Sequence, residues 1–190
     1  MNLARRAADR ASRLFHGGMN RNDYTTWRTA RTLDDIGELT ARWLEGSIQS
    51  QPGYQPGYGP DPETIPHIPV LAAACRTGFV TLGSQSADGP WNAWVDGLIS
   101  EVDLAWLTTV THGTDLTIDY RCRRGDHHGH QETFFWCPRR NICESLLRHS
   151  PNAAAAIRDA WYVRIIDPEP GRNSMLWPAL AIYAGLVVTS

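Results

Sequence analysis

Residues that can bind a metal ion are concentrated between positions 122 and 149. Thiolates and imidazoles are the ligands that zinc prefers, and four of them fill a tetrahedral site. The spacing is irregular, however, because no Cys-x-x-Cys pair occurs. The alternative is a polar hairpin loop over residues 123–131, with Cys137 and Cys143 as small core side chains. We favour this second interpretation and expect no metal site. The candidate zinc ligands are Cys122, His127, His128, His130, Cys137, Cys143 and His149.

The sequence lacks the motifs of several common catalytic mechanisms. All 18 basic side chains are arginine, so no lysine is present for a Schiff base or a P-loop. Neither a G-x-S-x-G nucleophile motif nor a G-x-G-x-x-G dinucleotide motif occurs. A formal net charge of −2 argues against a nucleic-acid partner, which usually meets a marked basic excess.

Membrane and secretion signals are also missing from the pattern. No apolar run approaches the ~20 residues that span a bilayer, and the N-terminal residues lack the apolar centre of a secretory signal. We therefore expect a cytoplasmic protein with reduced thiols and no membrane partner.

Two clusters of polar side chains lie at the ends of apolar stretches. Glu63 and Thr64 precede a predicted helix, and the pattern Thr81-x-x-Ser84 ends the predicted strand that follows it. In open α/β sheets, ligands bind where hydroxyls and backbone amides converge at the ends of strands. The alternative is that these side chains satisfy turns, as polar strand ends usually do.

Helical and strand patterns alternate along the chain and predict an α/β (α+β) fold. We expect a single domain over residues 19–190 with a mixed central sheet flanked by helices, preceded by an Arg-rich helical extension over residues 1–18. The expected strands cover residues 79–82, 94–99, 115–121, 132–137 and 162–166. The expected helices cover residues 33–49, 101–110, 141–149, 152–160 and 175–186, together with one that ends near residue 76.

Individual residues indicate where two of the predicted helices begin or end and what kind of connection follows the first of them. Asp34 and Asp35 suit the first turn of their helix through the macrodipole, and Gly78 suits a left-handed C-cap. Pro66 and Pro69 leave the start of the helix before Gly78 open. The duplicated Gln-Pro-Gly-Tyr over residues 51–58 predicts a turn-rich connection, which either lies over the domain or covers a ligand.

Several segments, in the same order, resemble the C-terminal regulatory domain of eukaryotic methylenetetrahydrofolate reductase. That domain carries Glu-Thr, a helix, Gly, a short apolar strand, Thr, two residues and Ser-Gln. The matching segments are Glu63-Thr64 with 75–85 (CRTGFVTLGSQ), 35–39 (DIGEL), 132–140 (ETFFWCPRR), and 162–167 (YVRIID) followed by Asn173 and Leu176-Trp177. They extend over about residues 34–185 and cover most of the chain.

The resemblance implies binding of S-adenosylmethionine, with S-adenosylhomocysteine as a competing ligand. Matched position by position, it implies ligand contacts by Glu63, Thr64, Thr81 and Ser84, and by Thr133. A carboxylate accepts hydrogen bonds from ribose hydroxyls or the ligand's amino group and offsets the sulfonium charge. Hydroxyl side chains can form hydrogen bonds with the ligand's carboxylate, its amino group or the edge of its adenine. Aromatic rings attract the sulfonium by cation–π interaction. The candidates for that contact are Trp91, Trp94 and Trp136.

The sequence also departs from the reductase family. Ser86 stands where the family has Pro after Ser-Gln, which predicts a looser loop. The chain has no room for the reductase's TIM-barrel catalytic domain, so the resemblance does not imply folate reduction.

We therefore expect a stand-alone domain that binds this small-molecule ligand, with use of the ligand as a group donor as one option. One alternative is an S-adenosylmethionine-dependent methyltransferase acting on a small molecule. A second is a ligand-sensing regulatory protein that acts on a protein partner or as a homodimer, and a third is a zinc-binding interaction protein. The candidate bases for methyl transfer are Asp96, His112, His130 and His149.

Overall fold

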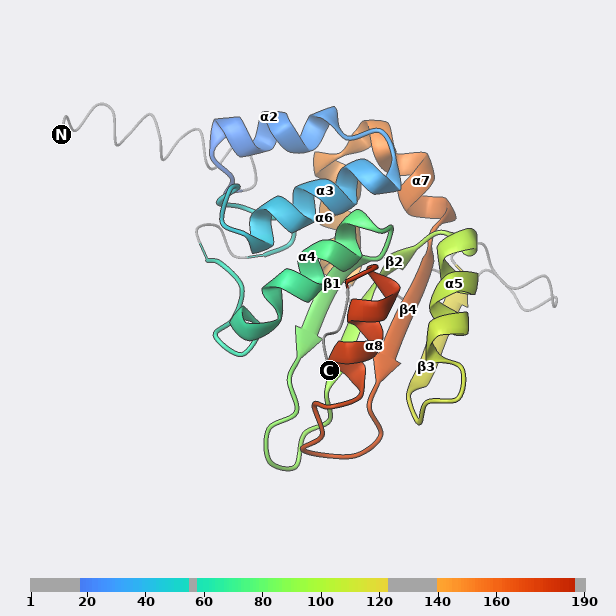
Figure 1. The fold of residues 1–190 in the computed structure, drawn as a ribbon. Coiled ribbons are helices and arrows are strands. Elements are labelled where there is room, and N and C mark those ends of the chain that lie inside the picture. Colours follow the sequence, from blue (N-terminus) through green and yellow to red (C-terminus); the bar gives the residue numbers. More distant parts are fainter. Residues whose placement is uncertain (1–17, 55–57, 123–139, 187–190) are drawn as a thin grey trace.

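An antiparallel four-stranded sheet forms the centre of the part of the chain that the structure describes (Figure 1). The structure is a computed structural model and describes residues 18–54, 58–122 and 140–186. The strands lie in the order β1-β2-β4-β3. Their bounds are β1 Val80–Gln85, β2 Trp94–Ile99, β3 Thr117–Cys122 and β4 Trp161–Ile166.

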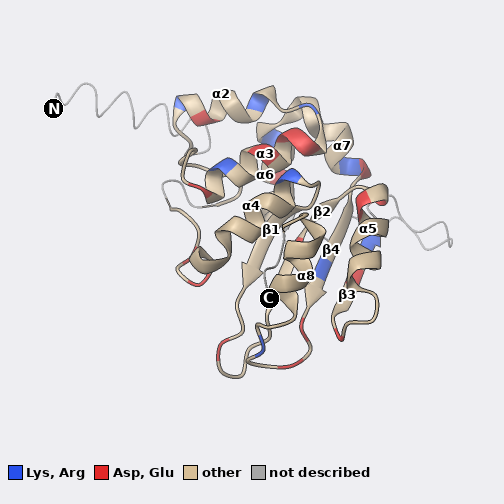
Figure 2. Ribbon diagram, in the orientation of Figure 1, with Lys and Arg blue, Asp and Glu red and all other residues tan. Residues whose placement is uncertain are grey.

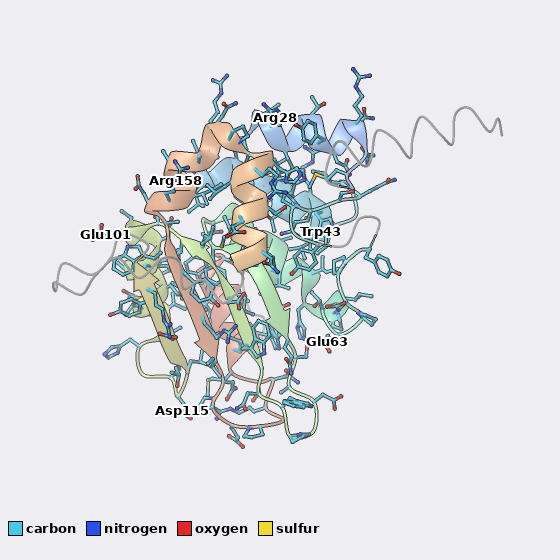
Figure 3. The ribbon with its side chains drawn as sticks, turned by 180° about the vertical axis from the view of Figure 1, so that it is seen from behind. Arg28, Trp43, Glu63, Glu101, Asp115 and Arg158 are labelled. Carbon is cyan, nitrogen blue, oxygen red and sulfur yellow. The ribbon has the colours of Figure 1, made fainter. Side chains whose placement is uncertain are left out.

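Helices cover both faces of this sheet, as the pattern of alternating elements predicts. Figures 1 and 3 show α4, α5 and α8 on one face and α6 on the other. The described helices are α2 Arg21–Thr29, α3 Leu33–Leu44, α4 Ile68–Arg76, α5 Glu101–Thr111, α6 Arg140–His149, α7 Ala154–Asp159 and α8 Leu176–Tyr183, with 3-10 turns at Ile65–His67 and Pro151–Ala153. The prediction of an α/β domain with a central sheet flanked by helices is confirmed.

The strand directions are not mixed as predicted, because each described pair of neighbours is antiparallel. β1 and β2 are joined by a short connection, which favours an antiparallel hairpin. β2 and β3 run in the same direction and are linked through α5, but β4 lies between them and pairs with both. A parallel crossover therefore exists in the chain without producing a parallel pair of neighbours.

The two faces of the sheet differ in chemistry because side chains alternate along each strand. Val95, Ile99, Val163 and Ile165 are buried on one face. On this face Phe79, just before β1, contacts the ring of Tyr183 from α8, which places the main apolar core between the sheet and α8. The other face carries the polar positions of β2 and β4.

Capping side chains fix where the first helices begin. The hydroxyl of Thr32 accepts the backbone N–H of Asp35, whose carboxylate in turn accepts the backbone N–H groups of Arg31 and Thr32. These backbone hydrogen bonds hold the pKa of Asp35 below its ordinary value. The expected acidic first turn of α3 is thus a complete capping box.

Several boundaries differ from the predicted ones for local reasons. α3 ends at Leu44 instead of residue 49, because Gly46 takes a left-handed conformation with φ of 79°. Pro66 lies in the 3-10 turn that precedes α4, and Gly78 closes that helix with φ of 101°, as expected. α2 was not predicted, since Trp27 is its only buried apolar residue.

Some predicted elements lie outside the described residues. These are the Arg-rich helix before residue 18, the loop over residues 123–131 and the strand over residues 132–137. Within the described ranges, none of the helices has the length and apolar character needed to cross a membrane.

Candidate functional site

A cavity of about 390 Å³ lies beside the edge strand β1. Its walls come from the end of α3, residues 53–54 and 60–64, α4, β1 and the first turn of α6. In Figure 3, Trp43 and Glu63 mark this side of the molecule, opposite the edge that β3 forms. The polar and aromatic side chains of the described lining are Trp43, Tyr54, Asp61, Thr64, Thr81, Ser84 and Asn141.

A β-bulge in β1 brings Thr81 and Ser84 to the same side of the strand. In a regular strand these positions face opposite sides, because they are three residues apart. Here Thr81 pairs with Gly97 and Gly83 pairs with Asp96, so Leu82 is an extra residue without a partner position. The extra residue shifts the alternation of side chains by one position, so the side chains of Thr81 and Ser84 point to the same side, and both residues line the cavity.

The carbonyl group released by this bulge is bound by the neighbouring connection. The hydroxyl of Tyr54 donates a hydrogen bond of 2.7 Å to the carbonyl oxygen of Leu82. The ring of Tyr54 also packs on Trp43, with the two centroids 4.8 Å apart. Two aromatic rings and the bulge therefore form one wall of the cavity.

The first copy of the duplicated tetrapeptide, residues 51–54, is a turn that we call the strap. The N–H of Tyr54 donates to the carbonyl oxygen of Gln51, with Pro52 and Gly53 between them. Gly53 has φ of 88°, as the third position of a type II turn requires. The strap packs against α6, where a Cβ on Gly53 would lie 2.6 Å from the Cα of Ile142. The strap thus lies over the domain and borders the cavity as well.

A second turn determines which carboxylate borders the cavity. The N–H of Thr64 donates a 2.8 Å hydrogen bond to the carbonyl oxygen of Asp61, which closes the turn Asp61-Pro62-Glu63-Thr64. The first and last residues of such a turn lie close together at its base. Accordingly, Asp61 and Thr64 line the cavity, whereas Glu63 is not part of the described lining, although both acidic residues are exposed.

Hydroxyl contacts hold this turn against the end of β1. Thr64 Oγ1 lies 3.3 Å from Ser84 Oγ, so the two predicted clusters meet directly. Ser86 Oγ donates a 3.0 Å hydrogen bond to the carbonyl oxygen of Glu63. Ser86, at the position where the reductase family has proline, therefore fastens the loop, whereas the sequence predicts a looser one.

Thr81 is buried and connects the cavity with α4. Its hydroxyl lies 3.2 Å from Sγ of Cys75, and its backbone N–H donates to the same sulfur. Burial raises the pKa of the Cys75 thiol to about 11, so the thiol stays protonated near neutral pH. Cys75 supports Thr81 and has no nucleophilic character.

The start of α6 adds a positive partial charge to the cavity. Asn141 and Ile142, in its first turn, belong to the lining. Backbone N–H groups in the first turn of a helix have no partner within the helix and attract anions. The cavity therefore combines an acidic side chain, from Asp61, with a helix end that favours a negatively charged group.

The candidate bases lie elsewhere. Asp96 is fully buried in β2, where Tyr162 and Arg164 donate hydrogen bonds to its Oδ2. His112 is exposed at the C-cap of α5, and His149 is buried with Nδ1 2.8 Å from the carbonyl oxygen of Ser145. None of them belongs to the described lining of the cavity, and His130 lies outside the described residues.

The predicted aromatic contacts are also absent from the described lining. Trp91 is exposed, and Trp94 lies under the guanidinium of Arg164 at 4.8 Å on the polar face of the sheet. Trp136 and the candidate contact Thr133 lie outside the described residues. The aromatic rings of the described lining are those of Trp43, which the sequence does not indicate as a ligand contact, and of Tyr54, whose segment the sequence offers as one that covers a ligand.

The candidate zinc ligands cannot be assembled from the described part of the chain. There, no group of three or more His, Cys, Asp or Glu side chains is arranged to hold a metal ion. Cys143 and His149 are buried in α6. The His-rich loop over residues 123–131 falls outside the described residues.

Comparison with known families assigns the chain to one family. Residues 22–184 match the family model described as "Domain of unknown function (DUF6919)", and the chain belongs to this family. The match includes each element that lines the cavity. No curated protein matches the sequence.

Proposed function

We propose that this member of the DUF6919 family binds S-adenosylmethionine or S-adenosylhomocysteine in the cavity beside β1. The observation that carries the proposal is the convergence of Thr64, Thr81 and Ser84 on one cavity. The likeness to the regulatory domain of methylenetetrahydrofolate reductase predicts ligand contacts at these three positions from the sequence alone. Convergence is not expected of side chains that only satisfy separate turns.

The chemistry of the cavity suits the parts of such a ligand. Hydroxyls of Thr64 and Ser84 both donate and accept, as ribose hydroxyls and an adenine edge require. The aromatic wall of Trp43 and Tyr54 offers π-faces for the sulfonium or the base. The first turn of α6 favours the ligand's carboxylate.

The size of the cavity is also compatible with a nucleoside of this class. Small-molecule sites typically enclose ~300–1,000 Å³, and this cavity measures about 390 Å³. The ligand would fill it and extend toward the exposed side of Asp61. The lining of the cavity combines apolar side chains with hydroxyl, amide and carboxylate groups, and the polar groups offer several hydrogen-bonding partners to a ligand.

Calorimetric titration of the full chain with each nucleoside tests the proposal. We expect saturable binding of at least one nucleoside below millimolar concentration. Thr64→Val and Ser84→Ala should each weaken that binding about two- to tenfold, because each removes one hydrogen-bonding hydroxyl. Thr117→Val is the matched control, since Thr117 is exposed on β3 at the opposite edge of the sheet.

Two results would contradict the proposal: no heat of binding for either nucleoside up to millimolar concentration, or unchanged affinity in both cavity variants. Use of the ligand as a methyl donor, a regulatory partner or homodimer, bound zinc and a cytoplasmic location remain predictions from the sequence. The methyltransferase alternative has its own readout, which is release of S-adenosylhomocysteine when S-adenosylmethionine is incubated with a cell extract.

A further inference from the structure

The lining of the cavity contains one acidic residue, and the two proposed ligands differ in whether their sulfur atom is positively charged. We infer that Asp61 makes the site selective for the cationic sulfonium of S-adenosylmethionine over the neutral thioether of S-adenosylhomocysteine. This inference rests on the proposed function and adds a specificity-determining residue to it. The sequence pattern directs attention to Glu63, whereas the geometry points to Asp61.

Asp61 is the only residue of the described lining with a charged side chain. Its backbone carbonyl is held by the N–H of Thr64 at the base of the turn, so the position of the residue is fixed relative to the Thr64–Ser84 contact. Its carboxylate makes no hydrogen bond or ion pair with any described residue, which leaves it available to a ligand. Asp61 therefore contributes an exposed negative charge to the lining of the cavity that no described residue neutralises.

The aromatic wall acts in the same direction as the carboxylate. Trp43 and Tyr54 pack on each other and line the cavity. A cation is attracted both by a carboxylate and by the faces of aromatic rings, whereas a thioether gains only the apolar contact. The two nucleosides share their adenosine, amino and carboxylate groups, so these contributions cancel in a comparison. The difference in affinity reports on the sulfonium alone.

The test compares both nucleosides by calorimetric titration of the full chain and of Asp61→Asn. Asn is also favoured at the first position of this turn, so the substitution removes the charge and preserves the fold. We expect the wild-type chain to bind S-adenosylmethionine about fivefold more tightly than S-adenosylhomocysteine, the range of a solvent-exposed ion pair. In Asp61→Asn this preference should fall to less than about twofold, with the affinity for S-adenosylhomocysteine unchanged.

Asp88→Asn is the matched control. The carbonyl oxygen of Asp88 also accepts the N–H of the residue three positions later, Trp91, so both substitutions occur at the first position of a turn. Asp88 does not belong to the described lining of the cavity, and its variant should keep the wild-type preference. Urea unfolding of each variant verifies that the fold is retained.

The outcomes separate the inference from the proposed function. If both nucleosides bind and Asp61→Asn weakens them equally, Asp61 contacts a shared group and the inference is wrong, although the site stands. If both bind and Asp61→Asn changes nothing, or Glu63→Gln removes the preference instead, the inference is also wrong. If neither nucleoside binds the wild-type chain, the proposed function fails together with the inference.

Discussion

At the residue scale, burial of the Cys75 thiol makes the stability of the fold decrease at alkaline pH. Burial raises the thiol pKa from its ordinary value of 9.0 to about 11 in the folded chain. The unfolded state therefore loses its proton first as pH rises, and the thiol's contribution to stability is present below pH 9.0 and lost toward pH 11. We expect a loss of about 1–2 kcal/mol in the free energy of unfolding between about pH 8 and about pH 10.5. Urea unfolding at the two pH values measures it.

The variant Cys75→Ala assigns that loss to the thiol. Alanine leaves a small cavity and lowers stability at every pH, but it removes the titrating group. Burial also raises the pKa of Tyr183, so part of the alkaline loss should persist in the variant. An equally steep loss in Cys75→Ala and in the wild type would show that the thiol does not contribute.

Side chains of the cavity could be predicted from the sequence where a motif contained them. Thr64, Thr81 and Ser84 line the cavity, whereas Glu63 of the same motif does not, and contact of these residues with a ligand stays a prediction. Asp61 was missed because the motif begins at Glu63, although Asp-Pro-x-Thr is itself a strong turn signal that places its first and last residues together. The position of Trp43 at the cavity could not be predicted, since an aromatic residue on the apolar face of a helix is ordinarily part of the core.

At the element scale, the strap depends on one glycine. In Gly53→Ala the new methyl group meets the backbone of Ile142 at 2.6 Å, and the residue must keep φ of 88°. A side chain in that conformation costs about 1–3 kcal/mol. We expect a loss of this size in the free energy of unfolding, or a local release of the strap that lowers ligand affinity without it. Urea unfolding and calorimetric titration together separate the two results.

Gly59→Ala is the control for the strap. Gly59 lies in the same connection, has no left-handed conformation, and its new methyl group would meet nothing within 4 Å. This variant should be within about 0.5 kcal/mol of the wild type. A Gly53→Ala chain with unchanged stability and unchanged affinity would mean that the strap adapts and does not shape the cavity.

Elements could be predicted from periodicity, but their distortions could not. Strands at residues 94–99 and 162–166 were predicted to within a residue of β2 and β4. The bulge at Leu82 leaves no such trace, because nothing in Thr81-Leu82-Gly83 shows that a partner strand skips one position. Yet that bulge is what brings Thr81 and Ser84 to one side, so the cavity follows from pairing and not from local pattern.

At the scale of the whole molecule, the sheet order joins distant parts of the chain. β4 comes from the last third of the sequence and lies between β2 and β3. The alternation of helices and strands predicts an α/β class, but strand order depends on contacts between residues far apart in sequence. The prediction of a mixed sheet was therefore wrong in strand direction, because direction and order depend on these distant contacts.

An ion pair between a partly exposed arginine and a buried carboxylate marks the junction of β2 and β4. Asp96 and Arg164 are directly paired across the strands, and Arg164 Nη2 donates to Asp96 Oδ2 at 2.6 Å. Figure 2 shows basic colouring on β4, and Arg164 is the basic residue in the sequence of that strand. The guanidinium also covers the ring of Trp94, whereas Asp96 is completely buried. A shift of β4 by one residue would turn Arg164 to the other face of the sheet and separate it from Asp96, which stays on β2.

Removing the cation should therefore cost more than the pair contributes. In Arg164→Met the carboxylate of Asp96 stays buried without its counter-charge, and we expect a loss of about 2–4 kcal/mol in the free energy of unfolding. The double variant Asp96→Asn with Arg164→Met removes the orphaned charge and should recover part of that loss.

As a control, Arg121→Met breaks the exposed pair with Asp119 on the edge strand β3 and should cost at most about 1 kcal/mol. Equal losses for Arg164→Met and Arg121→Met in urea unfolding would mean that the central pair does not fix the register of the sheet.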